Sequence, residues 1–111
     1  NPVSEIIALK DSLHLSAVQI VALTEVADTL QAKNTRIYKL IRMLLSKSQQ
    51  AGDATQMAGS VAMMLEEAGF NTRRAVVEAE KLLREDQRIF LPLEITERMD
   101  TANKPQASMK R

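Results

Sequence analysis

Two long stretches with the apolar spacing of helices constrain the fold of this chain more than any other feature. Between residues 17 and 48, apolar side chains recur every three or four positions, and one polar residue, Asn34, fills the only gap. Between residues 54 and 83, a second stripe has the same spacing but contains more small residues. Such spacing places an apolar face along one side of a helix. We therefore predict two long helices, over residues 17–48 and 54–83.

The segment between the two stripes, residues 48–53, predicts a tight turn. It is polar and holds Gly52, a residue type that commonly ends a helix, followed by Asp53, a preferred N-cap for the next helix. Helices joined by so short a loop pack antiparallel, so the numbers of paired positions should sum to about 101 or 102. The charged residues that this register brings close are Asp28 with Arg73 or Arg74, and Lys33 and Arg36 with Glu66 and Glu67.

Two residues inside the long helices leave alternatives open. Asn34 interrupts the first stripe, and a buried Asn at such a position usually specifies a register or an oligomeric state. It either faces a second copy and specifies a dimer, or faces Ala68 within the hairpin and fixes the register of the two helices. Gly69 either breaks the second helix or lies within a continuous, kinked one. We favour the continuous helix, because Gly costs only about 1 kcal/mol there.

Short helices are predicted on the N-terminal side of the hairpin. Ser16 followed three positions later by Gln19 has the spacing of a capping box, in which each side chain hydrogen-bonds a backbone N–H of the first helical turn. The first long helix should therefore begin at Ala17. Residues 3–13 carry an amphipathic pattern that predicts one short helix before it.

Short helices are also predicted on the C-terminal side of the hairpin. We predict a short helix over residues 85–91, an end imposed by Pro92, and another short helix over residues 93–100. Residues 101–111 have no periodicity and carry three cations, so we expect a flexible basic tail. Residues 1–100 would then form a single all-α domain, a long antiparallel helical hairpin with short flanking helices at both ends.

Composition supports this class and excludes several functions. The 111 residues include only three Gly and three Pro, which favours helix throughout, and are enough for one core. Fifteen Lys and Arg against 14 Asp and Glu leave a net charge of +1, and aromatic residues make up only 3%, so we expect no nucleic-acid binding. Cysteine is absent, which is compatible with the cytoplasm or the periplasm.

Residues capable of catalysis or metal binding are too few for an enzyme. His14 is the only histidine, and a transition-metal site needs several nitrogen, sulfur or oxygen ligands that converge on one ion. The acidic doublets at 66–67 and 85–86 fall on predicted helix surfaces without a histidine or a glycine-rich loop nearby. We expect no catalytic residue, no cofactor and no metal.

The tip of the hairpin offers a candidate surface for a protein partner. Met side chains adapt to varied partners, and four of them should gather near the turn: Met43, Met57, Met63 and Met64. The segment 33–47 carries five cations and no acid, namely Lys33, Arg36, Lys39, Arg42 and Lys47. We expect partner binding from the Met residues and the first four cations. The alternatives are that the Met residues fill the core and that the cations form a solvated face.

A family resemblance appears at the start of the first long helix. Residues 15–19, Leu-Ser-Ala-Val-Gln, resemble the LTxxQ signature of the Spy and CpxP family of periplasmic proteins, with Ser16 in place of Thr. In that family the motif opens the first long helix of an antiparallel hairpin, and a degenerate second copy follows the second long helix. Here residues 83–87, Leu-Arg-Glu-Asp-Gln, stand at that place and end in Gln87. Arg84 departs from the motif, which has Thr at that position.

The resemblance extends over about residues 3–99, because Leu91-Pro92 also follows the second copy as it often does in the family. It implies a helical, usually dimeric, periplasmic protein without enzyme activity. Some members act as chaperones, some restrain envelope-stress sensor kinases, and some sense metals. The single histidine disfavours the metal-sensing branch.

Together these features predict a non-catalytic extracytoplasmic protein-binding module, either chaperone-like or a regulator of an envelope protein. The alternative is a structural accessory subunit on the periplasmic side of a membrane protein complex, for example an energy-transducing one. A homodimer is compatible with both. No run of apolar residues approaches the roughly 20 that span a bilayer, and the N-terminus lacks the pattern of a signal segment. We therefore expect the mature form of a periplasmic chain.

Overall fold

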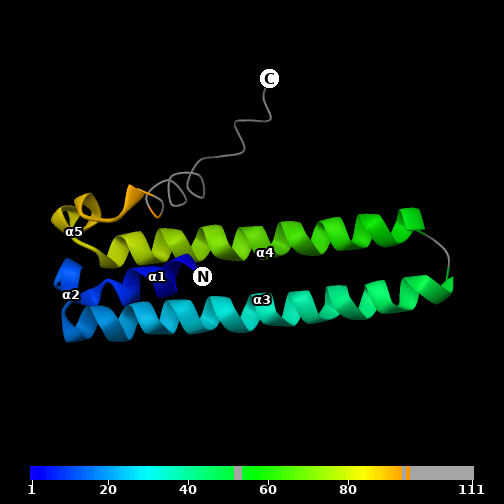
Figure 1. Cartoon of the computed structure of the whole chain (residues 1–111), viewed down its shortest axis with the longest axis horizontal. Coiled ribbons are helices and arrows are strands. Elements are labelled where there is room, and N and C mark those ends of the chain that lie inside the picture. The colour runs from blue at the N-terminus through cyan, green and yellow to red at the C-terminus, as the bar shows by residue number, and fades with distance from the viewer. Residues whose placement is uncertain (52–53, 94, 96–111) are drawn as a thin grey trace, which may run out of the picture.

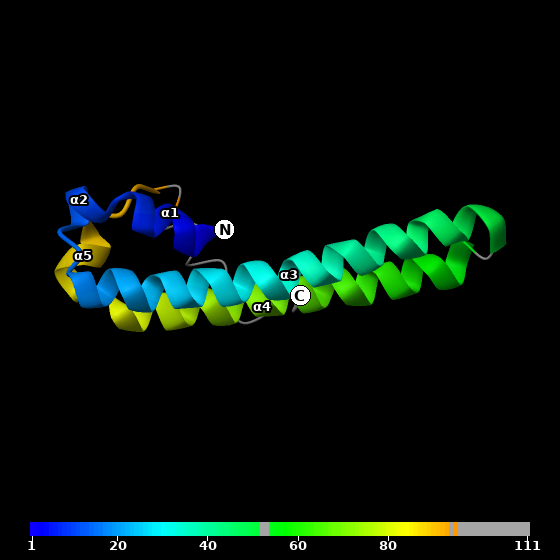
Figure 2. The same ribbon diagram turned by 90° about the horizontal axis from the view of Figure 1, so that it is seen from below.

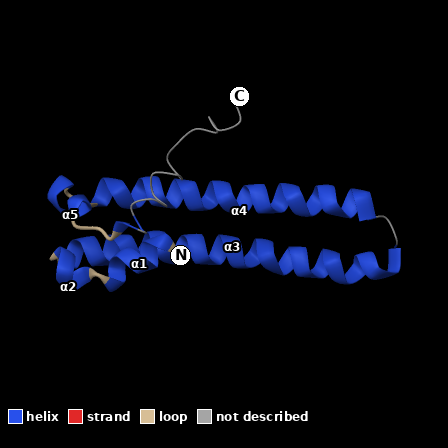
Figure 3. Cartoon of the chain, turned by 45° about the horizontal axis from the view of Figure 1, so that its top comes forward, coloured by secondary structure: helices blue, strands red, loops and turns tan. Residues whose placement is uncertain are grey.

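The structure is a computed structural model that describes residues 1–51, 54–93 and 95. Within these residues it is all-α, without a strand, as predicted (Figure 3). The five helices are α1 (Pro2–Ala8), α2 (Lys10–Leu13), α3 (Ala17–Ala51), α4 (Ala54–Leu82) and α5 (Glu85–Ile89).

The two long helices lie side by side and run antiparallel (Figures 1 and 2). Their register agrees with the prediction, because the Asn34 side chain donates a hydrogen bond to the carbonyl of Ala68, and these residue numbers sum to 102. Helix α4 continues through Gly69, as favoured. Helix α3 begins at Ala17 as predicted, but it extends to Ala51, beyond the expected end at residue 48.

The predicted single helix over residues 3–13 is wrong, because α1 and α2 are separated at Leu9. The N–H of Leu9 donates to the carbonyl of Ile6 (3.0 Å), three residues back, which tightens the turn and ends α1. This break lets α1 pack along the hairpin while α2 turns away across its end (Figure 2). Helix α2 ends at Leu13, and its C-cap residue His14 has a left-handed backbone (φ 56°) that reverses the chain into α3.

Asn1 fixes α1 through both polar atoms of its side chain. Its side-chain oxygen accepts hydrogen bonds from the N–H groups of Val3 (3.0 Å) and Ser4 (3.3 Å), which caps α1. Its side-chain nitrogen donates to the carbonyl of Ala27 in α3 (3.0 Å). The cap of α1 is therefore also a contact with the hairpin.

The core is concentrated at the end of the hairpin that α1 covers. One cluster there combines residues of both long helices with α1, α2 and the C-terminal segment: Val3, Ile6, Leu13, Leu23, Ala27, Leu30, Ala75, Val76, Ala79, Leu83, Leu91 and Ile95. Toward the tip, the buried cluster shrinks to Ile37, Ile41 and Ala68. The hairpin thus has a third layer at one end and none at its tip, where apolar side chains remain exposed.

The C-terminal elements differ in part from expectation. Helix α5 ends at Ile89 instead of residue 91, and the chain then turns so that Leu91 and Ile95 enter the core on either side of Pro92. The predicted helix over 93–100 lies outside the described residues, except for the helical Leu93 and Ile95. The predicted Gly52 stop, Asp53 cap and 101–111 tail also lie outside them.

Candidate protein-binding site

The capping box that opens α3 has both of its expected hydrogen bonds. The N–H of Gln19 donates to Ser16 Oγ (3.0 Å), and the N–H of Ser16 donates to Gln19 Oε1 (2.9 Å). These contacts satisfy backbone groups that the first helical turn leaves without partners. The start of α3 at Ala17 follows from them.

The second copy of the motif keeps half of this arrangement. The N–H of Arg84 donates to Gln87 Oε1 (2.8 Å), just as the N–H of Ser16 donates to Gln19 Oε1 in the first copy. Arg84 cannot complete the box, because a guanidinium has no acceptor atom. It instead hydrogen-bonds Asp86 (3.1 Å), and this contact lowers the pKa of the exposed Asp86 carboxyl.

The two motif glutamines meet in a reciprocal pair of hydrogen bonds. Gln19 Nε2 donates to Gln87 Oε1 (2.8 Å), and Gln87 Nε2 donates to Gln19 Oε1 (3.1 Å). Each Nε2 also donates to a backbone carbonyl across the fold, that of Leu82 for Gln19 (2.8 Å) and that of Leu13 for Gln87 (3.1 Å). Gln87 is 2% exposed. The pair ties α2, α3, α4 and α5 together, so these residues have a structural role.

Replacing Ser16 by Ala should destabilise the domain by about 1 kcal/mol, because the N–H of Gln19 loses its acceptor. Denaturant midpoints of Ser16→Ala and of the matched control Ser46→Ala would measure this. Ser46 is exposed within α3, where Ala is the better helix former, so the control should be neutral or slightly stabilising. Equal midpoints for the two variants would contradict the capping role.

The Asn34 cluster joins the two long helices within one chain. Asn34 Nδ2 donates to the carbonyl of Ala68 (3.3 Å) and to Thr72 Oγ1 (3.2 Å), and Asn71 Nδ2 donates to Asn34 Oδ1 (3.1 Å). Of the two roles considered for Asn34, these bonds match the intrachain one, which fixes the register of the hairpin.

The charge pairs expected from the register do not form among the described residues, although the register itself is correct. Asp28 is exposed and lies half a helical turn from the buried stripe of α3, so its carboxylate faces away from α4. Lys33 lines a groove together with Asn71 and Arg74 instead of Glu66 and Glu67. Matching residue numbers across the hairpin therefore did not determine which outward-facing side chains meet.

The four methionines do not gather on one surface. Met64 packs against the buried Ile37 and Ile41, and Met57 lines an apolar groove on the face that contains Leu45. Met43 is half exposed on the outer side of α3, and Met63 is 72% exposed. Nearness to the turn does not bring the four to one face, because neighbouring positions such as 63 and 64 point about 100° apart on a helix.

An apolar groove lies at the tip of the hairpin. We call it the tip groove; it has a volume of about 460 Å³, and its lining is Leu45, Ala54, Met57, Ala58, Val61, Ala62 and Leu65. Leu45 is seven residues from Tyr38 and fourteen from Gln31, both of which lie beside Asn1. Residues seven apart share a helix face. The tip groove is therefore the uncovered continuation of the face that α1 covers.

The predicted cations all lie exposed on α3, but they do not form one patch. Lys39, Arg42 and Lys47 surround Met43 on the outer side of the helix. Lys33 faces the opposite side of the hairpin from the tip groove, and Arg36 is exposed on α3 without lining either groove. The tip is thus electropositive on α3 and apolar between the helices. Of the residues that line the tip groove, sequence reasoning identified Met57 and missed the others, although the run of small residues in α4 signals a shallow, uncovered groove.

Other kinds of site are not found in the part of the chain that the structure describes. It contains no cluster of three or more His, Asp or Glu side chains placed to hold a metal ion. None of its helices combines the length and the apolar character needed to cross a bilayer. Comparison of the chain with models of protein families, with curated proteins and with solved structures finds no match.

Proposed function

We propose that this chain is a non-catalytic, extracytoplasmic protein-binding module of the Spy and CpxP kind, chaperone-like or regulatory. The observation that carries the proposal is the tip groove, an apolar surface left uncovered beside exposed cations of α3. Large apolar patches on otherwise polar surfaces commonly mark protein-interaction sites. The hydrogen-bonded glutamines Gln19 and Gln87 support the family resemblance as well. The two motif copies that hold them open α3 and follow α4, and they meet at the same end of the hairpin.

Binding at the tip would combine two effects. Leu45, Met57 and Leu65 offer apolar surface, and the flexible Met side chain adapts to different contacts. Arg36, Lys39 and Arg42 add positive charge, which steers acidic segments toward the tip. A weakly specific site of this kind suits an acidic, partly unfolded client or an acidic segment of an envelope protein.

Reversing three of these charges should weaken binding to an unfolded acidic client. The variant is Arg36→Glu with Lys39→Glu and Arg42→Glu, and carboxymethylated α-lactalbumin, which stays unfolded, is the probe. We expect about a tenfold loss of affinity at low salt, and a smaller loss as salt screens the charges. Helix content should hardly change, because Glu is as good a helix former as Lys or Arg.

The matched control reverses three cations outside the segment 33–47, Lys10, Lys81 and Lys104, and so makes the same change in net charge. Fluorescence anisotropy of the labelled client would compare the two variants. If both lose affinity equally, only net charge matters. An unaltered affinity in the folded triple variant would move the site elsewhere, to the exposed apolar surface of Ile89, Phe90 and Leu93.

A second candidate function, a fixed accessory subunit of a membrane protein complex, is favoured by the surface around α5. Ile89, Phe90 and Leu93 are each more than 70% exposed within five consecutive residues. A permanent subunit would bury such side chains against one partner. Affinity purification from a membrane fraction would separate the two functions, because a subunit should bring down one stoichiometric partner and a chaperone many weak ones.

A further inference from the structure

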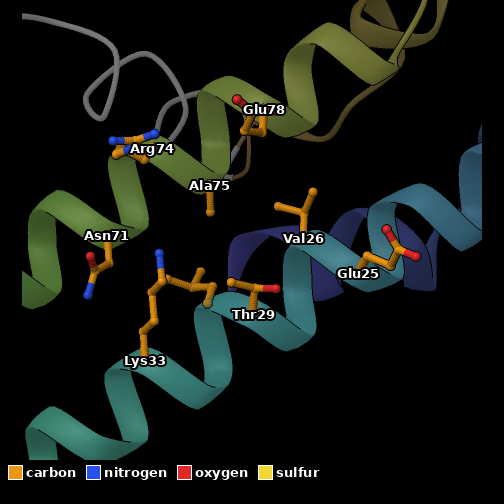
Figure 4. Close-up of a pocket in the computed structure, with 9 residues that line it drawn as sticks. Glu25, Val26, Thr29, Lys33, Asn71, Arg74, Ala75 and Glu78 are labelled. Atoms are coloured by element: carbon orange, nitrogen blue, oxygen red, sulfur yellow. The ribbon is translucent and has the colours of Figure 1, made fainter.

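A second groove lies between α3 and α4, separate from the tip groove. Its lining residues come from these two helices alone, and the α1 ribbon lies behind it in Figure 4. It has a volume of about 310 Å³. We call it the central groove. It is open on the side of the hairpin that α1 does not cover.

The floor of the central groove is apolar. Leu30 and Ala75 are buried beneath it, and Val26 is half-buried at its edge. On the opposite side of the same two helices, α1 inserts Val3 and Ile6, which are 0% and 1% exposed. The hairpin thus already packs one amphipathic helix, α1, against an apolar surface between α3 and α4. The central groove offers a second apolar surface between the same two helices.

The charged rim of the central groove is divided by sign. Glu25 and Glu78 lie toward the end of the hairpin that holds α5, and Lys33 and Arg74 lie toward the tip (Figure 4). Glu25 and Lys33 are eight residues apart on α3, which corresponds to about 12 Å along the helix. All four side chains are exposed, and none forms an ion pair with another described residue. The guanidinium of Arg74 lies 5.8 Å from the centroid of the Phe70 ring.

We infer that the central groove binds an amphipathic helix of a partner protein, with cations at one end and carboxylates about two turns away. Apolar side chains at spacings of three and four would rest on Val26 and Ala75, as those of α1 do on the other side. The cations would face Glu25 and Glu78, and the carboxylates would face Lys33 and Arg74. A uniformly acidic or uniformly basic helix would be repelled at one end of the groove.

This inference rests on the proposed function only in taking the chain to be a protein-binding module. It concerns a different groove and a different partner, because the tip is expected to prefer acidic segments. The two proposals can therefore fail independently.

Three stapled helical peptides of about 15 residues would test the inference on the whole chain. They share one Leu and Ala stripe and differ in their end charges: two Lys then two Glu, four Glu, or four Lys. We expect the mixed-charge peptide to bind at least about tenfold more tightly than the other two at low salt. Fluorescence anisotropy would give the dissociation constants.

Two double variants locate the binding. Lys33→Glu with Arg74→Glu makes the rim acidic and should switch the preference to the four-Lys peptide. Glu25→Lys with Glu78→Lys makes it basic and should switch the preference to the four-Glu peptide. Lys10→Glu with Lys81→Glu makes the same change in net charge as the first variant outside the groove, and should leave the preference unchanged.

The inference is overturned if the mixed-charge peptide has no advantage, or if its advantage survives in both groove variants. All substituted residues are exposed, and circular dichroism would verify that the variants stay folded. If the unmodified chain shows no preference for the mixed-charge peptide but still binds the unfolded acidic client, only the inference about the central groove is refuted. Failure of both probes would refute the proposed function as well.

Discussion

Replacing Gln87 by Ala should destabilise the fold by about 3 kcal/mol, one of the largest losses expected for a polar residue of this chain. The Gln87 amide accepts from the N–H of Arg84 and donates to the carbonyl of Leu13 while it also pairs with Gln19. Its removal would take away the described side-chain partners of the Arg84 N–H and the Leu13 carbonyl, and a buried polar group without a partner loses its hydration free energy.

Chemical denaturation of Gln87→Ala, Gln19→Ala and the double variant would measure both the loss and its origin. Because the two amides bond each other, the double variant should lose at least about 1 kcal/mol less than the sum of the single variants. Gln31→Ala is the matched control, since Gln31 is exposed and its side chain donates to Thr35 Oγ1 (3.3 Å) within the same helix. Strictly additive losses would show that the two glutamines act separately.

The long helices were predictable because local chemistry determines them. The apolar stripes established α3 and α4, and the capping box at Ser16 placed the start of α3 at Ala17. The short N-terminal helix was predicted less well. Its pattern runs through Leu9 without a break, and the division into α1 and α2 comes from packing across the end of the hairpin, which a local pattern does not record.

Some residues of the sites were recognised in the sequence, but the contacts between them were not predicted. Both motif copies were visible, yet the contact between Gln19 and Gln87 joins residues 68 positions apart and depends on how α2 and α5 close the hairpin. The alternatives for Asn34 stayed open until its bond to Ala68 was seen. The central groove was missed because its four charged residues are scattered through two helices and resemble an ordinary solvated face.

Replacing Leu23 by Ala should destabilise the protein by about 3 kcal/mol, because Leu23 is 0% exposed and its truncation leaves a cavity among close-packed neighbours. Leu40→Ala is the matched control. It makes the same chemical change in the same helix at a position that is 43% exposed, so it should alter stability by less than about 0.5 kcal/mol. Denaturant unfolding of both variants would measure the difference, and similar losses would contradict a core concentrated beneath α1.

The same pair of variants also tests whether stability is uneven along the hairpin. The cluster around Leu23 includes α1, whereas the cluster around Ile37 and Ile41 belongs to two helices only. Local openings therefore need less free energy near the tip, and hydrogen exchange should be faster for amides near Ile41 than near Leu23. In Leu23→Ala, exchange near Leu23 should accelerate toward the rate at the tip, because that region loses the packing that distinguishes it. Unchanged exchange near Leu23 would mean that the packing of Leu23 adds little to the stability of this end of the hairpin.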